Sequence, residues 1–300
     1  MRQDNPYALP HELFVVGFRP QTEWMWLIAT AFFLGELGAG LFLVSMLAGF
    51  PLGMVLGLLV VLVGKNTAHL MYLGRPERFW RALSNPVSSW ISRGFFAMAA
   101  FAVFGALYAA MSLGYVPLET SGSAGQAIKL VAGAAALLVM IYDGFVLSYS
   151  PAIQLWNTAL LPVLFGTYAM MGGTTLTLLL THLGLDQRSI SGDFLEPLEL
   201  VLILANLAML GVYVMTSVYS SVAARFAVQR LVKEYSLPFF GGVIVLGLLI
   251  TLLLSLYFAT SKIVYVLFGA AAAELVGDFL VILLVLKAGV FAPLVPESDF

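Results

Sequence analysis

Long apolar stretches alternate with short polar joints along almost the whole chain. A membrane-spanning helix needs about 20 consecutive, mostly apolar residues. Eight stretches meet this requirement: 24–47, 52–73, 94–115, 127–149, 155–181, 197–221, 237–259 and 264–291. Turn-forming or polar residues separate them, as in the polar run from Asp186 to Asp193. Because lipid cannot hydrogen-bond to backbone groups, the pattern predicts an all-α integral membrane protein with a bundle of about eight transmembrane helices.

The composition supports the same class of protein. Of 300 residues, 61% are hydrophobic and 10% are charged, whereas soluble domains are about 45–50% apolar and about 25% charged. The net charge of −2 gives no basic field for nucleic acid. Cysteine is absent, which excludes disulfides and cysteine-ligated iron–sulfur clusters within the chain. We expect a single transmembrane domain over residues 1–300, surrounded by lipid, with no metal site and no nucleic-acid partner.

Basic residues predict the orientation of the chain. An even number of spans puts both termini on one side, which collects Arg2, Arg19, Arg75, Arg78, Arg81, Arg93, Arg225, Arg230 and Lys233. The other side has Lys129, Arg188 and Lys262. The positive-inside rule therefore predicts cytoplasmic termini, with a cytoplasmic segment at residues 1–23 and an amphipathic cytoplasmic loop at residues 74–93.

Several titratable side chains fall inside the predicted spans, where a charge is costly and usually faces the bundle interior or a pathway. They are Glu36, Lys65, His69, Asp143, Glu274, Asp278 and Lys287. At about 1.5 Å per residue, His69, Tyr142 and Asp143 share a depth near the basic loops. Glu36 and Lys65 lie near mid-membrane, and Glu274 and Asp278 lie in the outer half to the middle.

This distribution predicts a polar pocket near the cytoplasmic surface, with a polar trail that leads away from it. A quinone suits such a pocket, because its ring needs apolar walls, its carbonyls need hydrogen-bond donors, and its reduction needs protons. We expect the quinone-binding residues to be Glu23, Trp24, His69, Tyr142, Asp143 and Asn157. We expect a proton path through Glu36, Lys65, Asp143 and Asp278.

Structural roles are open for several of these residues. Tyr142 and the tryptophans suit the interfacial aromatic belt, and His69 suits a backbone or headgroup partner. Lys287 suits snorkelling to the surface, and Lys65 could simply pair with Glu36. Asp143 has no such explanation, since an acid two turns inside a span needs a reason.

The histidines exclude a haem held by two of them. The chain has three histidines: His11 precedes the first span, while His69 and His182 are predicted at opposite ends of the membrane. No two of them share a depth, so we expect no haem.

Three stretches carry a family resemblance. The run His69-Leu-Met-Tyr-Leu-Gly-Arg-Pro-Glu-Arg, continued by Trp90-Ile-Ser-Arg-Gly, follows the second span. The segment Tyr142-Asp-Gly, with Trp156-Asn, joins the fourth and fifth spans, and Gly277-Asp, with Lys287-Ala-Gly, belongs to the last. In this order, over nearly the whole chain, they resemble the polysulfide reductase membrane-subunit family (NrfD-like).

The resemblance implies a membrane anchor subunit that binds ubiquinone or menaquinone. It implies two partners, an iron–sulfur (ferredoxin-like) subunit and a molybdopterin catalytic subunit, and electron transfer between the iron–sulfur subunit and the quinone. The sequence leaves open whether proton transfer accompanies it, as in a redox-driven proton pump. The resemblance also implies that Tyr142, and less directly Glu23 and Trp24, line the quinone site near the docking face. The chain departs from the family pattern at Asp143, where a small hydroxyl residue is common, and it has no histidine where span one opens.

The basic loop after the second span is the expected docking surface for the partner. Its residues are Arg75, Arg78, Arg81, Trp90 and Arg93. The membrane would be the cytoplasmic membrane of a bacterium or archaeon. A rival hypothesis is an ion or solute transporter that uses Glu36, Lys65, Glu274 and Asp278. The sequence lacks the paired, Gly/Pro-broken spans that usually mark a secondary transporter, so the anchor is favoured.

Overall fold

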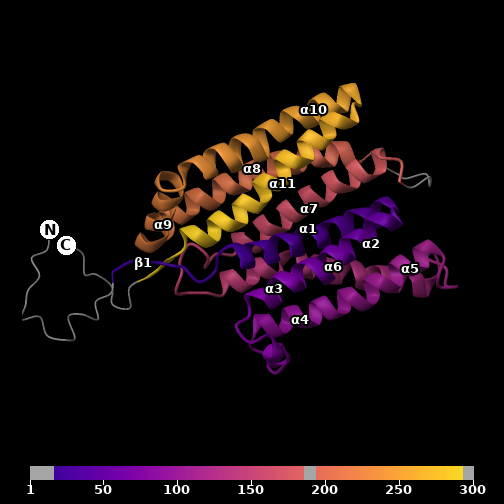
Figure 1. Cartoon of the computed structure of the whole chain (residues 1–300), viewed down its shortest axis with the longest axis horizontal. Helices are drawn as coiled ribbons and strands as arrows, with labels where there is room; N and C mark the ends of the chain where they lie inside the picture. The colour runs from indigo at the N-terminus through magenta and orange to yellow at the C-terminus, as the bar shows by residue number, and fades with distance from the viewer. Residues whose placement is uncertain (1–16, 186–193, 293–300) are drawn as a thin grey trace, which may run out of the picture.

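The protein is a multi-pass, all-α membrane protein. A computed structural model describes residues 17–185 and 194–292, and the chain is 80% helical (Figure 1). Within these residues eight helices are long and apolar enough to cross a membrane, which confirms the predicted number. They are Trp26–Ala48, Pro51–Tyr72, Trp90–Leu113, Ser123–Ser148, Leu160–His182, Leu195–Ser220, Leu237–Ser261 and Val264–Ala288.

Five spans are single α-helices, and three change their winding on the way across. The single helices are α1 (Trp26–Ala48), α6 (Ser123–Ser148), α7 (Leu160–His182), α8 (Leu195–Ser220) and α11 (Val264–Ala288). The composite spans contain π-helical stretches: α2 (Pro51–Leu59), η2 (Val60–Lys65) and α3 (Asn66–Tyr72); α4 (Trp90–Ala100), η4 (Phe101–Gly105) and α5 (Ala106–Leu113); and η5 (Leu237–Ile250) and α10 (Thr251–Ser261). π-helical turns are rare and often mark functional sites. Lys65, the last residue of η2, is therefore a candidate functional residue.

Three helices form the centre of the bundle. Inside the most apolar window of each span, 72% of α1, 72% of α7 and 67% of α11 is buried, against 28–44% for the other five spans. The three lie side by side through the middle of the molecule (Figure 1) and contact one another. Side chains that these helices turn inward therefore meet protein and not lipid.

Glycines let the two most buried helices touch backbone to backbone. A Cβ atom at Gly40 of α1 would collide with the carbonyl of Ala169 in α7, and one at Gly173 would collide with the backbone of Gly40. Lipid tails are as apolar as leucine, so membrane helices associate largely through such close van der Waals packing at small residues. The crossing of α1 and α7 at Gly40 and Gly173 therefore fixes the centre of the bundle.

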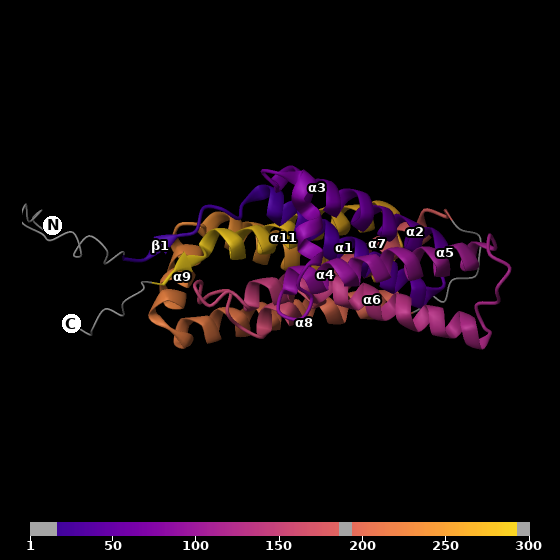
Figure 2. The ribbon, with the colours of Figure 1, turned by 90° about the horizontal axis from the view of Figure 1, so that it is seen from below.

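A short clasp joins the two ends of the chain. Strand β1 (Arg19–Pro20) pairs antiparallel with strand β2 (Val290–Phe291). The Gln21 side chain adds a hydrogen bond of 2.7 Å from Nε2 to the carbonyl of Leu286 in α11. The start of the first span and the end of the last are thereby fixed together at one face, here called the terminal face, next to α9 (Val222–Lys233) (Figure 2).

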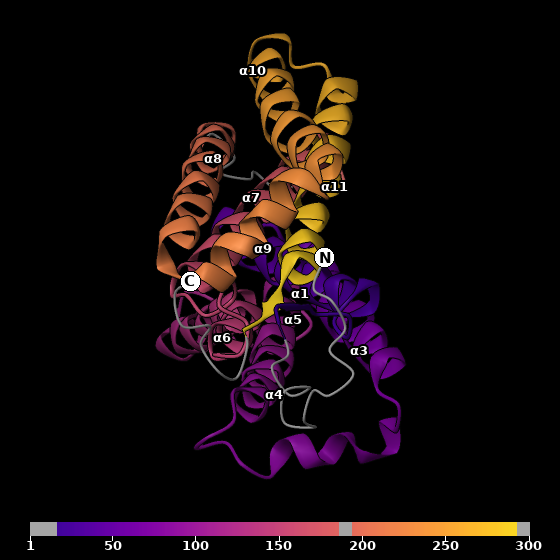
Figure 3. The same ribbon diagram turned by 90° about the vertical axis from the view of Figure 1, so that its left-hand side faces the viewer.

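The segment after the second span forms a separate 3₁₀ helix, η3 (Pro76–Leu83), which stands away from the bundle (Figure 3). Its Phe79 and Trp80 are 51% and 56% exposed. Lys287, which the sequence allowed to snorkel, places its ammonium 5.2 Å from the centre of the Trp26 ring at the terminal face. Residues 1–16 of the predicted N-terminal segment and the polar run Asp186 to Asp193 lie outside the described residues.

One predicted span begins several residues too early. The apolar run suggested a helix from residue 155, but α7 starts at Leu160. Residues 151–159 instead form turns that bury Leu155 and Trp156. The apolar character of these residues reflects burial at the end of the bundle, which hydropathy cannot distinguish from burial in lipid.

The glycine crossing gives a stability prediction. Gly173→Ala should destabilise the protein by about 1–3 kcal/mol, because the added methyl group overlaps the backbone of α1. Gly211→Ala in α8 is the matched control, since a Cβ there meets nothing within 4 Å. The control should be neutral or slightly stabilising, because alanine is the better helix former. Thermal unfolding in mild detergent measures both, and equal melting temperatures for the two variants would disprove the crossing.

Candidate functional site

A buried ion pair forms the centre of the candidate site. The Lys65 Nζ lies 2.5 Å from the Asp143 Oδ2, and both side chains are fully buried. The interpretation that Lys65 pairs with Glu36 is therefore wrong, because its partner comes from α6. A buried charge in protein is tolerated when it is paired and hydrogen-bonded. The pair thus explains how two charges remain stable inside the bundle.

A glycine on α1 makes room for the lysine. A Cβ atom at Gly35 would lie 2.6 Å from both Cδ and Nζ of Lys65. The ammonium also lies 5.5 Å from the centre of the Phe32 ring and 5.6 Å from that of Tyr142. Rings within about 6 Å attract a cation through their quadrupole. The lysine is therefore held by one carboxylate and two aromatic faces.

His69 lies one helical turn after the lysine. Its Nδ1 is 3.3 Å from the carbonyl oxygen of Lys65, and that oxygen can only accept. A neutral imidazole donates from one nitrogen and accepts at the other, so this contact assigns the proton to Nδ1 and the lone pair to Nε2. The Phe32 ring lies 6.2 Å away. His69 therefore offers a free acceptor beside the ion pair.

Tyr142 and Asp143 supply the remaining free polar atoms. Tyr142 is half-buried, and its ring fills the space left by Gly94, where a Cβ atom would collide with it. Its hydroxyl has no hydrogen-bond partner among residues 17–185 and 194–292. Within the same residues the buried Oδ1 of Asp143 also has none. A buried oxygen without a partner, such as Oδ1 of Asp143, is rare and calls for a partner from outside the chain.

Aromatic rings extend this site towards the terminal face. The Trp24 ring stacks on Trp156 at 5.5 Å and meets Phe32 edge-on at 6.1 Å. The Trp156 Nε1 donates to the carbonyl of Val285 in α11 at 2.8 Å, which fixes the stack to α11. The flat ring of a small molecule would find suitable walls here.

Two of the predicted quinone-binding residues are exposed and, within the described part of the chain, form no hydrogen bond or ring contact with the ion-pair residues; both are neighbours in the chain of the stacked tryptophans. Asn157 is exposed, and its Nδ2 donates to the carbonyl of Ser148 at 2.9 Å, so it caps the end of α6. Glu23 is also exposed and acts electrostatically on Tyr72. The structure thus brings together Trp24, His69, Tyr142 and Asp143 of the predicted set.

The predicted docking residues divide into two groups. Arg75, Arg78 and Arg81 are exposed on and before η3. Arg93 instead donates to the carbonyls of Pro86 at 3.1 Å and Val87 at 2.5 Å. Trp90 stacks on Phe145 of α6 with ring centres 4.5 Å apart. Arg93 and Trp90 therefore hold the loop to the bundle, while the three other arginines face outward.

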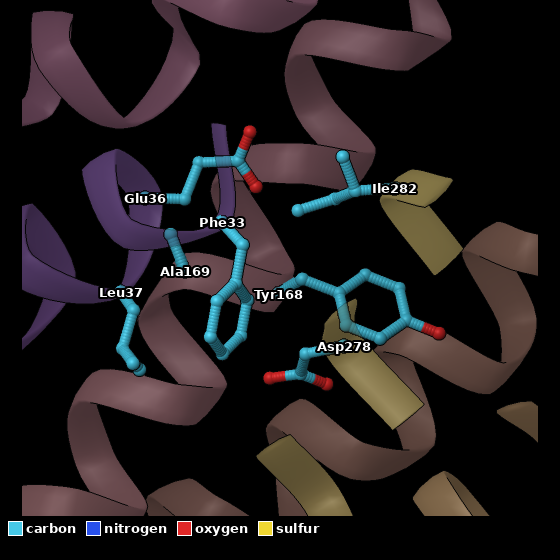
Figure 4. Close-up of a pocket in the computed structure, with 7 residues that line it drawn as sticks. All are labelled: Phe33, Glu36, Leu37, Tyr168, Ala169, Asp278 and Ile282. Atoms are coloured by element: carbon cyan, nitrogen blue, oxygen red, sulfur yellow. The ribbon is translucent and has the colours of Figure 1, made fainter. Parts of the chain in front are cut away.

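Beyond the ion pair, a small cavity separates two further acids. Glu36, Asp278 and Tyr168 line it together with Phe33, Leu37, Ala169 and Ile282. The Glu36 and Asp278 side chains enter from α1 and α11, with the Phe33 and Tyr168 rings between them (Figure 4). The cavity volume of about 10 Å³ is about what one water molecule needs.

Two more buried acids continue towards the opposite face. Glu274 accepts a hydrogen bond of 2.6 Å from the Thr175 hydroxyl, and Glu199 accepts one of 2.5 Å from the Ser255 hydroxyl. Glu199 was not among the predicted residues, because it lies four residues into α8, where a charge usually reaches water. Its position among the apolar residues of the predicted span 197–221 could have indicated that it is buried.

Comparison with known proteins identifies the family. A model of the polysulphide reductase NrfD family matches residues 15–293, nearly the whole chain. The chain belongs to this family. NrfD proteins are membrane subunits of oxidoreductase complexes, and the match confirms the resemblance seen in the sequence. A search of curated proteins finds no match.

The ion pair gives a prediction that depends on its burial. Asp143→Leu should destabilise this NrfD chain by about 3–5 kcal/mol, because it leaves the Lys65 charge buried without a partner. The double change Lys65→Met with Asp143→Leu should recover most of this loss, because no buried charge then remains. Unfolding of the purified parent, of Asp143→Leu, of Lys65→Met and of the double variant measures the four free energies of the cycle. Additive losses in the double variant would show that the two residues do not interact.

Proposed function

We propose that this chain is the quinone- and quinol-binding anchor of a multi-subunit molybdopterin oxidoreductase. It would pass electrons between an iron–sulfur partner subunit and the quinone pool of the membrane. One observation supports this most: Tyr142 and His69, a free donor and a free acceptor, flank a buried ion pair behind an aromatic wall. The family membership supplies the oxidoreductase context.

The free polar atoms fit a quinone head. The Tyr142 hydroxyl can donate a hydrogen bond to one quinone oxygen. The Nε2 of His69 can accept one from a quinol hydroxyl, because its other nitrogen faces the Lys65 carbonyl. Trp24 and Phe32 supply flat apolar walls. A bound quinone, either ubiquinone or menaquinone, would supply two-electron redox chemistry at this site.

The ion pair fits a role in proton exchange. Reduction of a quinone consumes two protons as well as two electrons, so a site needs titratable groups within reach. Asp143 has one oxygen on Lys65 and one without a partner among the described residues. That second oxygen can hold a proton while the first keeps Lys65 in place. Asp143 therefore acts as the proton carrier of the proposed site.

The exposed arginines fit a docking surface. Arg75, Arg78 and Arg81 project from the loop at the end of the second span that also carries Lys65 and His69. A partner that docks here would bring its nearest iron–sulfur cluster to the same end of the bundle as the quinone site. By the positive-inside rule, this face would be the cytoplasmic side of a bacterial or archaeal membrane. The rival, a transporter that works alone, receives no support from the family match.

The proposed donor can be tested directly. In the intact complex, Tyr142→Phe should lower kcat/KM for quinol-linked turnover about tenfold or more, since a lost hydrogen bond in a buried site costs about 1–3 kcal/mol. Tyr149→Phe is the matched control, because Tyr149 lies at the same end of α6 but is 65% exposed. Parental turnover in both variants would rule out the proposed site.

The docking surface gives an independent prediction. Arg78→Glu combined with Arg81→Glu should remove the iron- and molybdenum-containing partners from a mild-detergent pulldown, because like charges then face the docked subunit. Lys129→Glu, at the start of α6 on the opposite face, should leave the partners bound. For the parent protein, the yield of the partners in the pulldown should fall as the salt concentration rises, since exposed charges are screened. Equal yields from both variants would place the docking surface elsewhere.

A further inference from the structure

An exposed tryptophan stands where the first span begins. Trp26 is the first residue of α1, at the terminal face, and its side chain is 55% exposed although α1 is one of the most buried helices. Within the described residues its indole N–H has no hydrogen-bond partner. Tryptophan favours the membrane–water interface, because its body is apolar and its N–H is a donor. Trp26 therefore offers a donor at the level of the lipid headgroups.

A lysine without an acid beside it approaches this ring from the last span. Lys287 is the last residue but one of α11, and its ammonium lies 5.2 Å from the centre of the Trp26 ring. Among the described residues it forms no ion pair. Glu23, three residues before Trp26, acts electrostatically on Tyr72 instead. Since an ammonium can donate three hydrogen bonds, Lys287 is available to bind an anion.

The position of the ammonium differs from that of a lysine that only reaches for water. A snorkelling lysine carries its charge away from the apolar region into the solvent. The Lys287 ammonium lies instead over a ring of the neighbouring span, beside a free indole donor. The two helices contact each other along this junction, so the cation and the donor are held together by the packing of α1 against α11.

A strip of aromatic rings leads from this polar pair into the membrane. The Phe279 ring of α11 stacks on Trp26 with ring centres 5.5 Å apart, and Phe33 of α1 meets Phe279 edge-on at 5.7 Å. Both phenylalanines are half-buried. Phe33 follows Trp26 by seven residues and Phe279 precedes Lys287 by eight, so at 1.5 Å per residue the strip reaches about 10–12 Å into the spans. That depth corresponds to the upper part of an acyl chain.

A cation and a donor above an apolar strip match the chemistry of a phospholipid. Its phosphate is an anion at headgroup level, and lysine binds phosphate as a point charge. The positive-inside rule predicts that the terminal face is cytoplasmic, the side on which anionic lipids give a membrane its negative surface potential. Arg19 of β1, which pairs with β2 just beyond the end of α11, adds a second exposed cation. These charges favour an anionic lipid over a zwitterionic one.

We propose that Lys287 and Trp26 bind the phosphate of an anionic phospholipid, one acyl chain of which lies along Phe279 and Phe33. The ammonium and the indole N–H donate to phosphate oxygens, and no covalent bond changes. The lipid contacts the first and last spans at once, beside the clasp of β1 and β2. It therefore stabilises their junction, because a ligand that binds only the folded state favours that state. The site does not depend on the proposed function.

Lipid retention by the purified full chain tests the site. In native mass spectrometry from mild detergent, the parent should bind one phosphatidylglycerol more tightly than phosphatidylethanolamine. Lys287→Gln should weaken the binding of phosphatidylglycerol about fivefold, the contribution of one basic residue near an anionic surface. Lys233→Gln is the matched control, because Lys233 is exposed at the end of α9 on the same face. Equal binding of both lipids by the parent, or equal binding of phosphatidylglycerol by the two variants, would refute the proposal.

Quenching by brominated lipids tests where the acyl chain lies. In phosphatidylcholine nanodiscs, a small fraction of phosphatidylglycerol with bromine on its acyl chains should quench tryptophan fluorescence more than the same fraction of brominated phosphatidylcholine. This excess should disappear in Trp26→Phe, which removes the fluorophore beside the strip, and in Lys287→Gln, whereas Lys287→Arg should retain it. Excess quenching that survives Trp26→Phe would place the lipid at another tryptophan and overturn the assignment.

Thermal unfolding in detergent separates a lipid from a free anion. Added phosphatidylglycerol should raise the melting temperature of the parent more than that of Lys287→Gln. Without lipid the two should melt alike, because among the described residues Lys287 has no ion pair to lose. Inorganic phosphate at the same concentration should raise neither, since it has no chain to lie on Phe279. An equal rise with inorganic phosphate would show that an anion alone suffices, and the lipid assignment would be wrong.

Discussion

A charge inside this membrane protein must be neutralised by its neighbours, because lipid cannot solvate it. The chain meets that constraint in two ways. Lys65 and Asp143 neutralise each other at 2.5 Å. Glu36, Glu199, Glu274 and Asp278 have no cation among the described residues, so each avoids the cost of a buried charge only when it is protonated. The first arrangement requires α6 to lie against the second span so that the ammonium and the carboxylate meet. The function that we propose depends on this first arrangement.

The placement of the helices relative to one another depends on small residues more than on large apolar ones. Gly40 and Gly173 allow α1 and α7 to touch, while Gly35 and Gly94 leave space for the Lys65 chain and the Tyr142 ring. In lipid, apolar side chains gain little by leaving their solvent, so shape decides how helices associate. These glycines therefore determine where the polar atoms of the site can lie, although they contribute no functional group.

The sequence predicted the spans and the depth of the polar residues, because hydropathy and the rise per residue are properties of single helices. It could not predict which helices face each other. For that reason a pair of Lys65 with Glu36 stayed open, although the partner of Lys65 is Asp143 on α6. The hydrogen bond by which Asn157 caps α6 was not predicted either. For the same reason the sequence did not predict the roles of Gly35 and Gly94, which leave space for Lys65 and Tyr142, or of Glu199. These roles exist only once several helices are assembled.

The pairing of β1 with β2 joins residues about 270 positions apart in the chain. During synthesis, the first span must wait in the membrane for the last before this clasp can form. Helix α1 contacts α11 as well as α7, so the water-sized cavity is also incomplete until then. Glu36 and Asp278, which line this cavity from α1 and α11, therefore come together only after the last span has joined the bundle.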